Sequence, residues 1–229
     1  MPGVTERTSG GSQTLERGLR LLRVLADHPD GLSVSELAAA LDTHRAGIYR
    51  LLGPLVDQRL AVRGENGRYV LGAGLIELAS RVRPRLQEVA VARLRTLADE
   101  LRATTALTVR DGEEAVVAAV VEPRNSDMHI SYRAGLRHRL DQAASGVAIL
   151  AGLPPRPGER ATIREARERG WAVTSSELLP GATGVGVPVL VPGRECEAAV
   201  TAVWTDGRDP ASAAPAVAAA AREIAAALG

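Results

Sequence analysis

The stretch from Leu32 to Leu71 constrains the fold of this chain more than any other part of the sequence. Ser33 is followed three residues later by Glu36, which is the spacing of a capping box at the start of a short helix. A second helix is expected from Thr43 to Gln58, where apolar residues recur at helical spacing, namely Ile48, Leu51, Leu52, Leu55 and Val56. The stretch therefore predicts two helices joined by a tight turn.

A predicted hairpin follows these helices. Its two runs extend from Leu60 to Arg63 and from Arg68 to Leu71, and Gly64-Glu65-Asn66-Gly67 joins them with residues typical of hairpin turns. Asp42 or Thr43 is expected to cap the second helix. Helix, turn, helix and hairpin together make the winged form of the helix-turn-helix.

The charge of this winged segment favours contact with nucleic acid. Residues 43–71 carry five arginines and two acids, a local excess of three positive charges, although the formal net charge of the chain is only +1. Guanidinium groups pair with phosphates, which set affinity, or with guanine, which sets specificity. We expect the protein to bind double-stranded DNA through Ser33, Thr43, His44, Arg45, Tyr49, Arg50, Arg63 and Arg68. A winged helix that serves only for dimerisation is the alternative.

Composition excludes several kinds of site. Lys is absent, so the chain has neither a Schiff-base lysine nor a phosphate-loop lysine. Cys196 is the single cysteine, which excludes an internal disulfide and a zinc finger within one chain and suits a reducing cytoplasm. Its neighbour Arg194 makes Cys196 a candidate sensor thiol. No metal or cofactor is expected.

The chain divides into four predicted parts. Residues 1–12 are polar and glycine-rich, so we expect a disordered arm rather than a signal peptide. Residues 13–72 form the winged domain, 73–83 a linker helix, and 84–229 a second domain. No apolar run of membrane-spanning length is expected.

The second domain mixes helices and strands. Its predicted helices cover 85–102, 141–150, 162–169 and 210–228, and its predicted strands cover 104–109, 115–121, 128–132, 171–174, 184–190 and 198–205. The chain as a whole is therefore expected to be an α+β protein.

Several short motifs occur in a fixed order along the chain. They are Leu15–Leu22, Ser33-x-x-Glu36-Leu37-Ala38, Tyr49–Leu52, Gly67-Arg68-Tyr69-x-Leu71-Gly72, Gly135-Leu136, Ala144-Ser145-Gly146, Gly170–Val173 and Pro180–Val189. Their order and spacing resemble the IclR-type transcriptional regulators. The resemblance implies a C-terminal effector-binding domain with an antiparallel, GAF-like sheet. It also implies a cytoplasmic homodimer or dimer of dimers.

The resemblance places an effector pocket in the second domain. Small residues and a serine at a loop-to-helix junction, Ala143–Gly146, leave backbone N–H groups open to an anion. Arg137 and Arg139 lie just before them, and no carboxylate is evident on these segments, so we expect a small organic acid. The candidate effector-binding residues are Ala143, Ala144, Ser145, Gly146, Gly184, Thr201, Val203 and Thr205.

Two alternatives stay open. The stretch between Leu153 and Thr162 is shorter than is usual in the family, so one alternative is a regulator with a degenerate pocket that senses no small molecule. An enzyme that uses the winged helix only to dimerise is the other alternative, but no nucleotide-type glycine loop with a downstream acid is present. The cluster His138-Arg139-Leu140-Asp141 resembles a base with its orienting acid. Adjacent residues do not face one another on a regular element, so we expect no catalytic residue.

Overall fold

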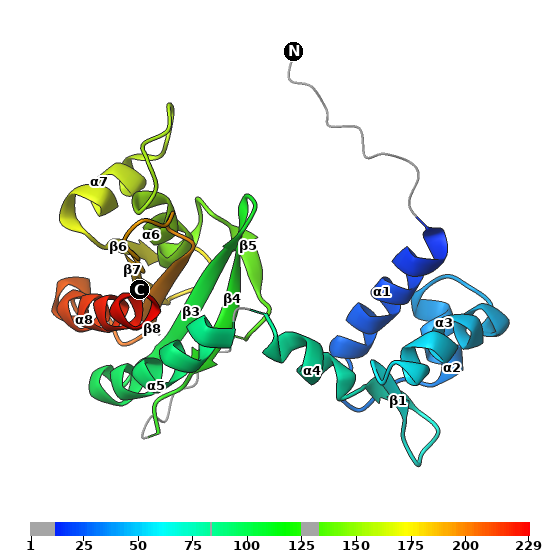
Figure 1. The fold of residues 1–229 in the computed structure, drawn as a ribbon. Coiled ribbons are helices and arrows are strands. Elements are labelled where there is room, and N and C mark those ends of the chain that lie inside the picture. Colours follow the sequence, from blue (N-terminus) through cyan, green and yellow to red (C-terminus); the bar gives the residue numbers. More distant parts are fainter. Residues whose placement is uncertain (1–11, 83, 125–132) are drawn as a thin grey trace. The chain divides into compact units, whose positions relative to one another are not determined.

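The computed structural model describes residues 12–82, 84–124 and 133–229, and it has the expected α+β class (Figure 1). The chain divides into two compact units, residues 1–82 and 83–229. We call them the winged unit and the sheet unit. The expected arm lies outside the described residues except for Ser12, whose hydroxyl instead caps the first helix by accepting the Leu15 N–H at 3.4 Å.

The winged unit contains the predicted helices and hairpin. Its elements in order are α1 (Gln13–Ala26), α2 (Val34–Ala40), α3 (Arg45–Asp57), β1 (Ala61–Arg63), β2 (Tyr69–Leu71) and α4 (Gly74–Ser80). The first three helices and the hairpin enclose one apolar core, whose members include Leu21, Leu25, Leu37, Ile48, Leu52 and Tyr69. The capping box is confirmed, because Ser33 and Glu36 each accept the other's backbone N–H.

The expected cap of α3 is wrong. His44 is the N-cap, in extended backbone and with no side-chain hydrogen bond to the helix. Asp42 instead adopts a φ of +46°, which takes the chain through the turn between α2 and α3. The helix therefore begins at Arg45, two residues later than predicted.

The segment before α2 pairs with the hairpin through one antiparallel bridge between Leu32 and Tyr69. Leu32 and Tyr69 exchange backbone hydrogen bonds of 2.9 and 2.7 Å. Gly31 makes this approach possible, because its φ is +76° and a Cβ there would lie 2.8 Å from the Tyr69 carbonyl oxygen. This pairing ties the wing to the start of the helix pair.

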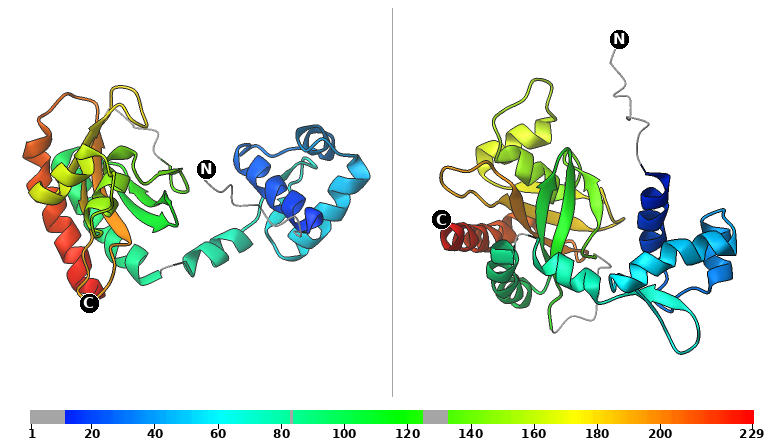
Figure 2. Two further views of the ribbon diagram at one scale, coloured as in Figure 1. Left: turned by 90° about the horizontal axis from the view of Figure 1, so that it is seen from above. Right: turned by 45° about the vertical axis from the view of Figure 1, so that its right-hand side comes forward.

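A six-stranded antiparallel sheet organises the sheet unit. The strands are β3 (Thr104–Asp111), β4 (Glu114–Val121), β5 (Arg137–Arg139), β6 (Ala172–Ser175), β7 (Thr183–Pro188) and β8 (Ala198–Trp204), and their order is β5-β4-β3-β8-β7-β6. Helices α5 (Pro84–Leu101) and α8 (Pro210–Leu228) pack on one face, and α6 (Ala143–Ala151) and α7 (Ala161–Arg169) lie on the other side (Figures 1 and 2).

Two sequence expectations need comment here. The predicted strand Met128–Tyr132 lies outside the described residues. Strand β5 was missed, because three residues of alternating charge and histidine give no apolar pattern; it pairs with the start of β4, His138 opposite Ala115.

Helix α8 corrects the expectation that no run is long enough for a membrane. The helix has 19 residues, and an 18-residue window of it has a mean hydropathy of 1.2, enough to span a bilayer by length and composition. Its side chains have another partner, because Val217 and Ile224 are fully buried in the core shared with α5 and the sheet. We read α8 as a core helix.

Candidate DNA-binding surface and effector pocket

The exposed side of α3 carries the first group of predicted DNA-binding residues. Arg45, Tyr49 and Arg50 are exposed, while Ile48 and Leu52 lie in the core beneath them. Arg45 and Tyr49 are four residues apart and so share one face of the helix. Tyr49 is 59% exposed, which is a high exposure for an aromatic side chain. The structure thus presents a cationic and aromatic helix face to solvent.

Ser33 and Arg68 have structural tasks within the winged unit. The Ser33 hydroxyl accepts the Glu36 N–H at 3.3 Å. Arg68 donates from Nη2 to the Glu36 carboxylate and from Nε to the Gly31 carbonyl, both at 3.0 Å. The bonds from Ser33, followed by that from Arg68, lower the pKa of Glu36 from 4.5 to about 2. Arg68 therefore fastens the wing to α2, and a third of its side chain stays exposed.

The other predicted residues lie around α3 and the wing. His44 is exposed at the N-cap of α3, and Thr43 is half-buried one residue earlier. Arg63 is exposed at the end of β1. The set predicted from sequence is thus distributed over the start of α2, the first turns of α3 and the wing.

A small cavity lies between the first turn of α6, strands β7 and β8, and the loop that follows β6. We call it the α6 pocket; its lining is Ala143, Ala144, Ser145, Thr174, Glu177, Leu178, Leu179, Ala182, Gly184, Thr201 and Val203. Six of the eight predicted effector-binding residues belong to this lining. The cavity has a volume of about 30 Å³, which holds about one or two water molecules.

Gly146 and Thr205 lie outside the lining. A Cβ on Gly146 would lie 2.4 Å from the Leu140 carbonyl oxygen, so this glycine permits close packing of α6 on the preceding turn. Thr205 follows the last residue of β8 and is exposed. Each position thus has a place in the fold different from the expected one.

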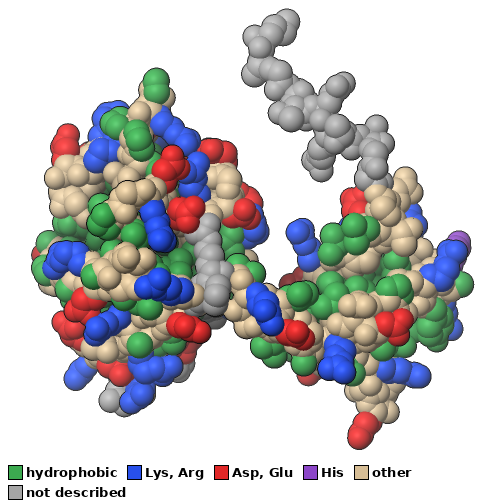
Figure 3. Space-filling model, viewed as in Figure 1, with side chains coloured by type: hydrophobic (Ala, Val, Ile, Leu, Met, Phe, Trp, Pro, Cys, Tyr) green, Lys and Arg blue, Asp and Glu red, His purple; other side chains and the backbone are tan. Residues whose placement is uncertain are grey.

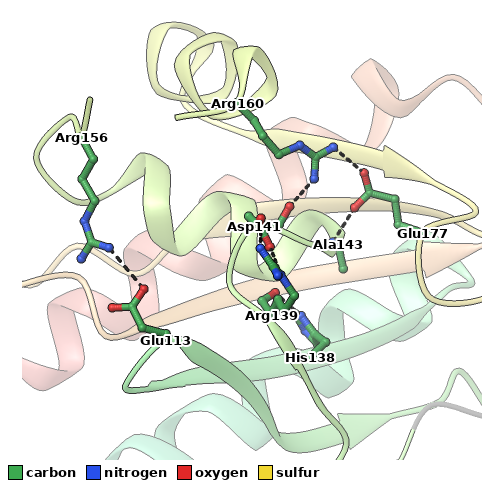
Figure 4. A network of polar contacts seen from close by, with 8 residues as sticks. All are labelled: Glu113, His138, Arg139, Asp141, Ala143, Arg156, Arg160 and Glu177. Atoms are coloured by element: carbon green, nitrogen blue, oxygen red, sulfur yellow. Dashed lines mark hydrogen bonds and ion pairs between the residues drawn. The ribbon is translucent and has the colours of Figure 1, made fainter. Parts of the chain in front are cut away.

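The sequence analysis missed five residues of this lining, namely Thr174, Glu177, Leu178, Leu179 and Ala182, and Glu177 is the charged one among them. One of its carboxylate oxygens accepts the Ala143 N–H at 2.7 Å, and the other accepts Arg160 at 2.9 Å (Figure 4). The expected open anion site at the start of α6 therefore already faces an internal carboxylate. Glu177 is 34 residues from Ala143 and lies outside any regular element, so no local spacing signalled it.

Arg137 and Arg139 do not supply the positive potential expected for the pocket. Arg137 pairs with Asp111 at 2.5 Å and with Glu114 at 2.8 Å, and Arg139 pairs with Asp141 at 2.7 Å. These acids raise the pKa of both guanidinium groups. Neither arginine belongs to the lining, and their charges are compensated locally.

His138 pairs with Ser145 rather than with an acid. Its Nε2 lies 3.1 Å from Ser145 Oγ, and its Nδ1 lies 2.9 Å from the Arg139 carbonyl oxygen. Burial lowers the pKa of His138, which favours the neutral ring. Asp141 binds Arg139 instead, so the pairing of a base with an orienting acid is not formed.

Cys196 does not fit the idea of a sensor thiol. The side chain is 2% exposed and contacts Gly152 beneath α6. Burial raises its pKa from 9.0 to about 11, which keeps the thiol protonated and unreactive. Among residues 12–82, 84–124 and 133–229, no three His, Cys, Asp or Glu side chains are grouped to hold a metal ion.

Comparisons with known sequences find relatives of this chain among transcriptional regulators. A family model described as the IclR helix-turn-helix domain matches residues 14–65. The HTH-type transcriptional regulator Rv1719 of Mycobacterium tuberculosis is 37% identical over 155 residues, which are 67% of this chain and 59% of that protein. TtgV of Pseudomonas putida, also an HTH-type transcriptional regulator, is 27% identical over 148 residues, 64% of this chain and 56% of that protein. The chain thus covers less than two thirds of either relative.

Solved structures extend the likeness to both units. The Thermotoga maritima IclR superposes with a TM-score of 0.77 at 26% identity, over 94% of this chain and 98% of the other. An IclR homologue from Microbacterium hydrocarbonoxydans, complexed with 4-hydroxybenzoate, has a TM-score of 0.81 at 22% identity, again over 94% and 98%. The second comparison, at its low identity, supports the fold alone.

Proposed function

Because this chain belongs to the IclR family of transcriptional regulators, we propose that it binds specific DNA sites and regulates transcription in response to a small-molecule effector. The observation that carries the proposal is the face of α3, where Arg45, Tyr49 and Arg50 are exposed on a helix whose opposite face is buried. A wing with an exposed Arg63 follows the same helix. We propose no catalytic activity.

We assign different tasks to the two arginines of α3. Arg45 is the first residue of the helix, and recognition helices contact base edges mainly through their N-terminal residues. We therefore propose that Arg45 reads a base and that Arg50, further along, contacts a phosphate. Ser33, Thr43, His44, Tyr49, Arg63 and Arg68 complete the proposed surface.

Genomic DNA flanking the gene provides the test. A footprint on that DNA, followed by fluorescence anisotropy with the protected site and with a random duplex of equal length, measures affinity and specificity. We expect specific binding that weakens with salt, because phosphate contacts release counterions. Equal affinity for the protected and random duplexes would reject sequence-specific regulation.

We propose that the α6 pocket is the effector site. Support comes from the cavity and from the predicted residues that line it. A homologue of the same fold was solved in complex with 4-hydroxybenzoate. The sequence favours a small organic acid. Two facts bear on the choice between an acid and a hydroxyl compound. The ligand 4-hydroxybenzoate contains both a carboxylate and a hydroxyl group, and the lining of the α6 pocket contains the Glu177 side chain. Ser145→Trp should fill the cavity, abolish the ligand response and leave DNA affinity without ligand nearly unchanged. A normal response in this variant would place the effector elsewhere.

We propose that the protein acts in the cytoplasm as a homodimer or a dimer of dimers. Ile76, Leu78 and Val82 are 73%, 59% and 57% exposed on and just after α4, and Leu15 and Leu19 are exposed on α1. Hydrophobic side chains are visible on the surface of the winged unit in Figure 3. Two-fold proteins match two-fold DNA sites. Sedimentation that gives a monomer at micromolar concentration, with and without DNA, would reject this.

A further inference from the structure

The polar side chains that line the α6 pocket are Ser145, Thr174, Glu177 and Thr201. What each side chain offers a ligand depends on its protonation and on the hydrogen bonds that it already donates within the protein. A hydroxyl whose proton is already donated presents only lone pairs, and an ionised carboxylate is an acceptor only. The lining can therefore be read as a pattern of donors and acceptors.

Ser145 presents an acceptor to the cavity. A carbonyl oxygen only accepts, so the 2.9 Å contact with Arg139 O places a hydrogen on His138 Nδ1. In the neutral ring Nε2 is then an acceptor, and the 3.1 Å contact takes the Ser145 hydroxyl proton. Ser145 is 1% exposed, so this pairing is held inside the fold.

Thr201 has the same polarity. Its hydroxyl donates to the Ala106 carbonyl oxygen at 3.4 Å on the neighbouring strand, and the residue is 2% exposed. Its remaining lone pairs are the part available to the cavity. Thr174, the fourth polar side chain, keeps a hydroxyl that can rotate to donate or accept.

Glu177 is the only ionisable side chain in the lining. Its bonds to the Ala143 N–H and to Arg160 fix the carboxylate at the start of α6, where the helix dipole also favours it. A ligand carboxylate would face the lone pairs of Glu177, Ser145 and Thr201, and of the four polar side chains in the lining just Thr174 could donate a hydrogen bond to it. A ligand cation would gain little, because Arg160 already compensates the Glu177 charge (Figure 4).

We propose that the α6 pocket selects an uncharged hydroxyl compound, an alcohol or a phenol, over a carboxylic acid, with Glu177 as the specificity-determining residue. The ligand hydroxyl donates its one proton to Glu177 or to Ser145, and the apolar body of the ligand contacts Leu178, Leu179 and Val203. This inference rests on the proposed effector site and replaces the acid expected from the sequence. A ligand larger than the 30 Å³ cavity takes the space of the Leu178 and Leu179 side chains.

Three probes with one carbon skeleton test the proposal. Benzyl alcohol, benzoate and benzylammonium present a neutral donor, an anion and a cation, and isothermal titration calorimetry on the full chain measures the affinity of each. We expect benzyl alcohol to bind at least about tenfold more tightly than benzoate, since a carboxylate that is buried without enough hydrogen-bond donors loses free energy. The pair 2-methylpropanol and 2-methylpropanoate repeats the comparison on a smaller skeleton.

Two substitutions on the ion pair predict opposite changes. Glu177→Gln leaves Arg160 without its carboxylate partner beside the pocket, although its bond to the Asp141 carbonyl oxygen stays, and should move benzoate above benzyl alcohol. Arg160→Gln leaves the Glu177 charge uncompensated and should move benzylammonium to first place. Glu113→Gln is the matched control, because this carboxylate pairs with Arg156 in the same region but lies outside the lining. Circular dichroism and operator binding check the fold of each variant.

The outcomes separate this inference from the proposed function. Tighter binding of benzoate than of benzyl alcohol by the unchanged protein would overturn the hydroxyl assignment and leave the effector site standing. An unchanged order of affinities in both Glu177→Gln and Arg160→Gln would remove Glu177 as the determinant. Failure of every probe to bind, with operator binding intact, would overturn the effector site itself. A changed order in Arg160→Gln supports the proposal even if Glu177→Gln does not fold.

Discussion

Two glycines of β7 provide a matched pair of alanine substitutions, of which one should destabilise the fold strongly and the other hardly at all. Gly184 and Gly186 are two residues apart on one strand and so face α6 from the same side of the sheet. A Cβ on Gly186 would lie 2.3 Å from the Ala144 carbonyl oxygen and 2.7 Å from its carbon. A Cβ on Gly184 would lie 3.4 Å from the Ala144 Cβ, which is an ordinary contact.

The expected destabilisation follows from these distances. Gly186→Ala requires α6 to retreat by at least 0.7 Å to open the contact to 3.0 Å, and backbone atoms of a packed helix have no side-chain rotamer that relieves the clash. We expect a loss of about 3 kcal/mol, at the upper end of typical overpacking. Gly184→Ala should stay within about 1 kcal/mol of the unchanged protein, since the methyl group finds space and the unfolded chain loses entropy.

Differential scanning calorimetry of the full chain measures both effects. For a unit of this size, about 3 kcal/mol corresponds to a fall in Tm of about 6–12 °C for the sheet unit. Gly184→Ala should keep the Tm and instead weaken ligand binding, because its methyl group points at the pocket wall formed by Ala144. Equal Tm values for the two variants would refute the packing argument.

Three further predictions concern DNA contacts and pH. Arg50→Ala should weaken binding to all sequences and lower the salt slope by about one per subunit, whereas Arg45→Ala should cost about 1–3 kcal/mol at one base position, both measured by anisotropy; wild-type binding by both variants would reject the assignment of α3. Glu36 has a folded pKa of about 2 against an ordinary 4.5, so its contribution to stability is present above pH 4.5 and is lost as pH falls towards 2; Glu36→Gln should flatten the acid melting profile of the winged unit in that window. Burial lowers the pKa of His138 below 6.5, so the unfolded chain binds a proton first and the stability of the sheet unit should fall as pH drops below 6.5; a melting temperature with the same pH dependence in His138→Gln would contradict this.

The winged unit was predictable because its signals are local. Ser33 and Glu36 bond across one helical turn, and the apolar stripe of α3 repeats at helical spacing. The wing follows from turn residues between two short runs. The cap of α3 was predicted wrongly for a different reason. Asp42 and Thr43 have side chains that can cap a helix, but the positive φ of Asp42 places both residues in the turn before the helix begins.

The pocket was only partly predictable because its polarity depends on distant pairs. The resemblance located the start of α6, Gly184 and the inner face of β8, and the fold brings them together. The partner of Ala143 is Glu177, and the partner of Ser145 is His138 on a strand whose pattern gave no signal. These contacts reverse the expected chemistry from an open donor site to a set of acceptors.

The loop after β6 links ligand binding to the packing of the sheet. Leu178 and Leu179 pack with Ala106 and Val117 on the face of the sheet towards α6, so they act as part of the core while the cavity is small. A ligand that takes their place removes apolar contacts of the two leucines and makes apolar contacts of its own. The two effects largely offset each other, because each is worth about 25 cal/mol per Å² of buried apolar area. Under the proposed specificity, the polar end of the ligand then sets the preference for one state over the other, through its contacts with Glu177 and Ser145. An effector acts only through its different affinities for two states, so we infer that an effector bound at the proposed site would change the position of this loop first.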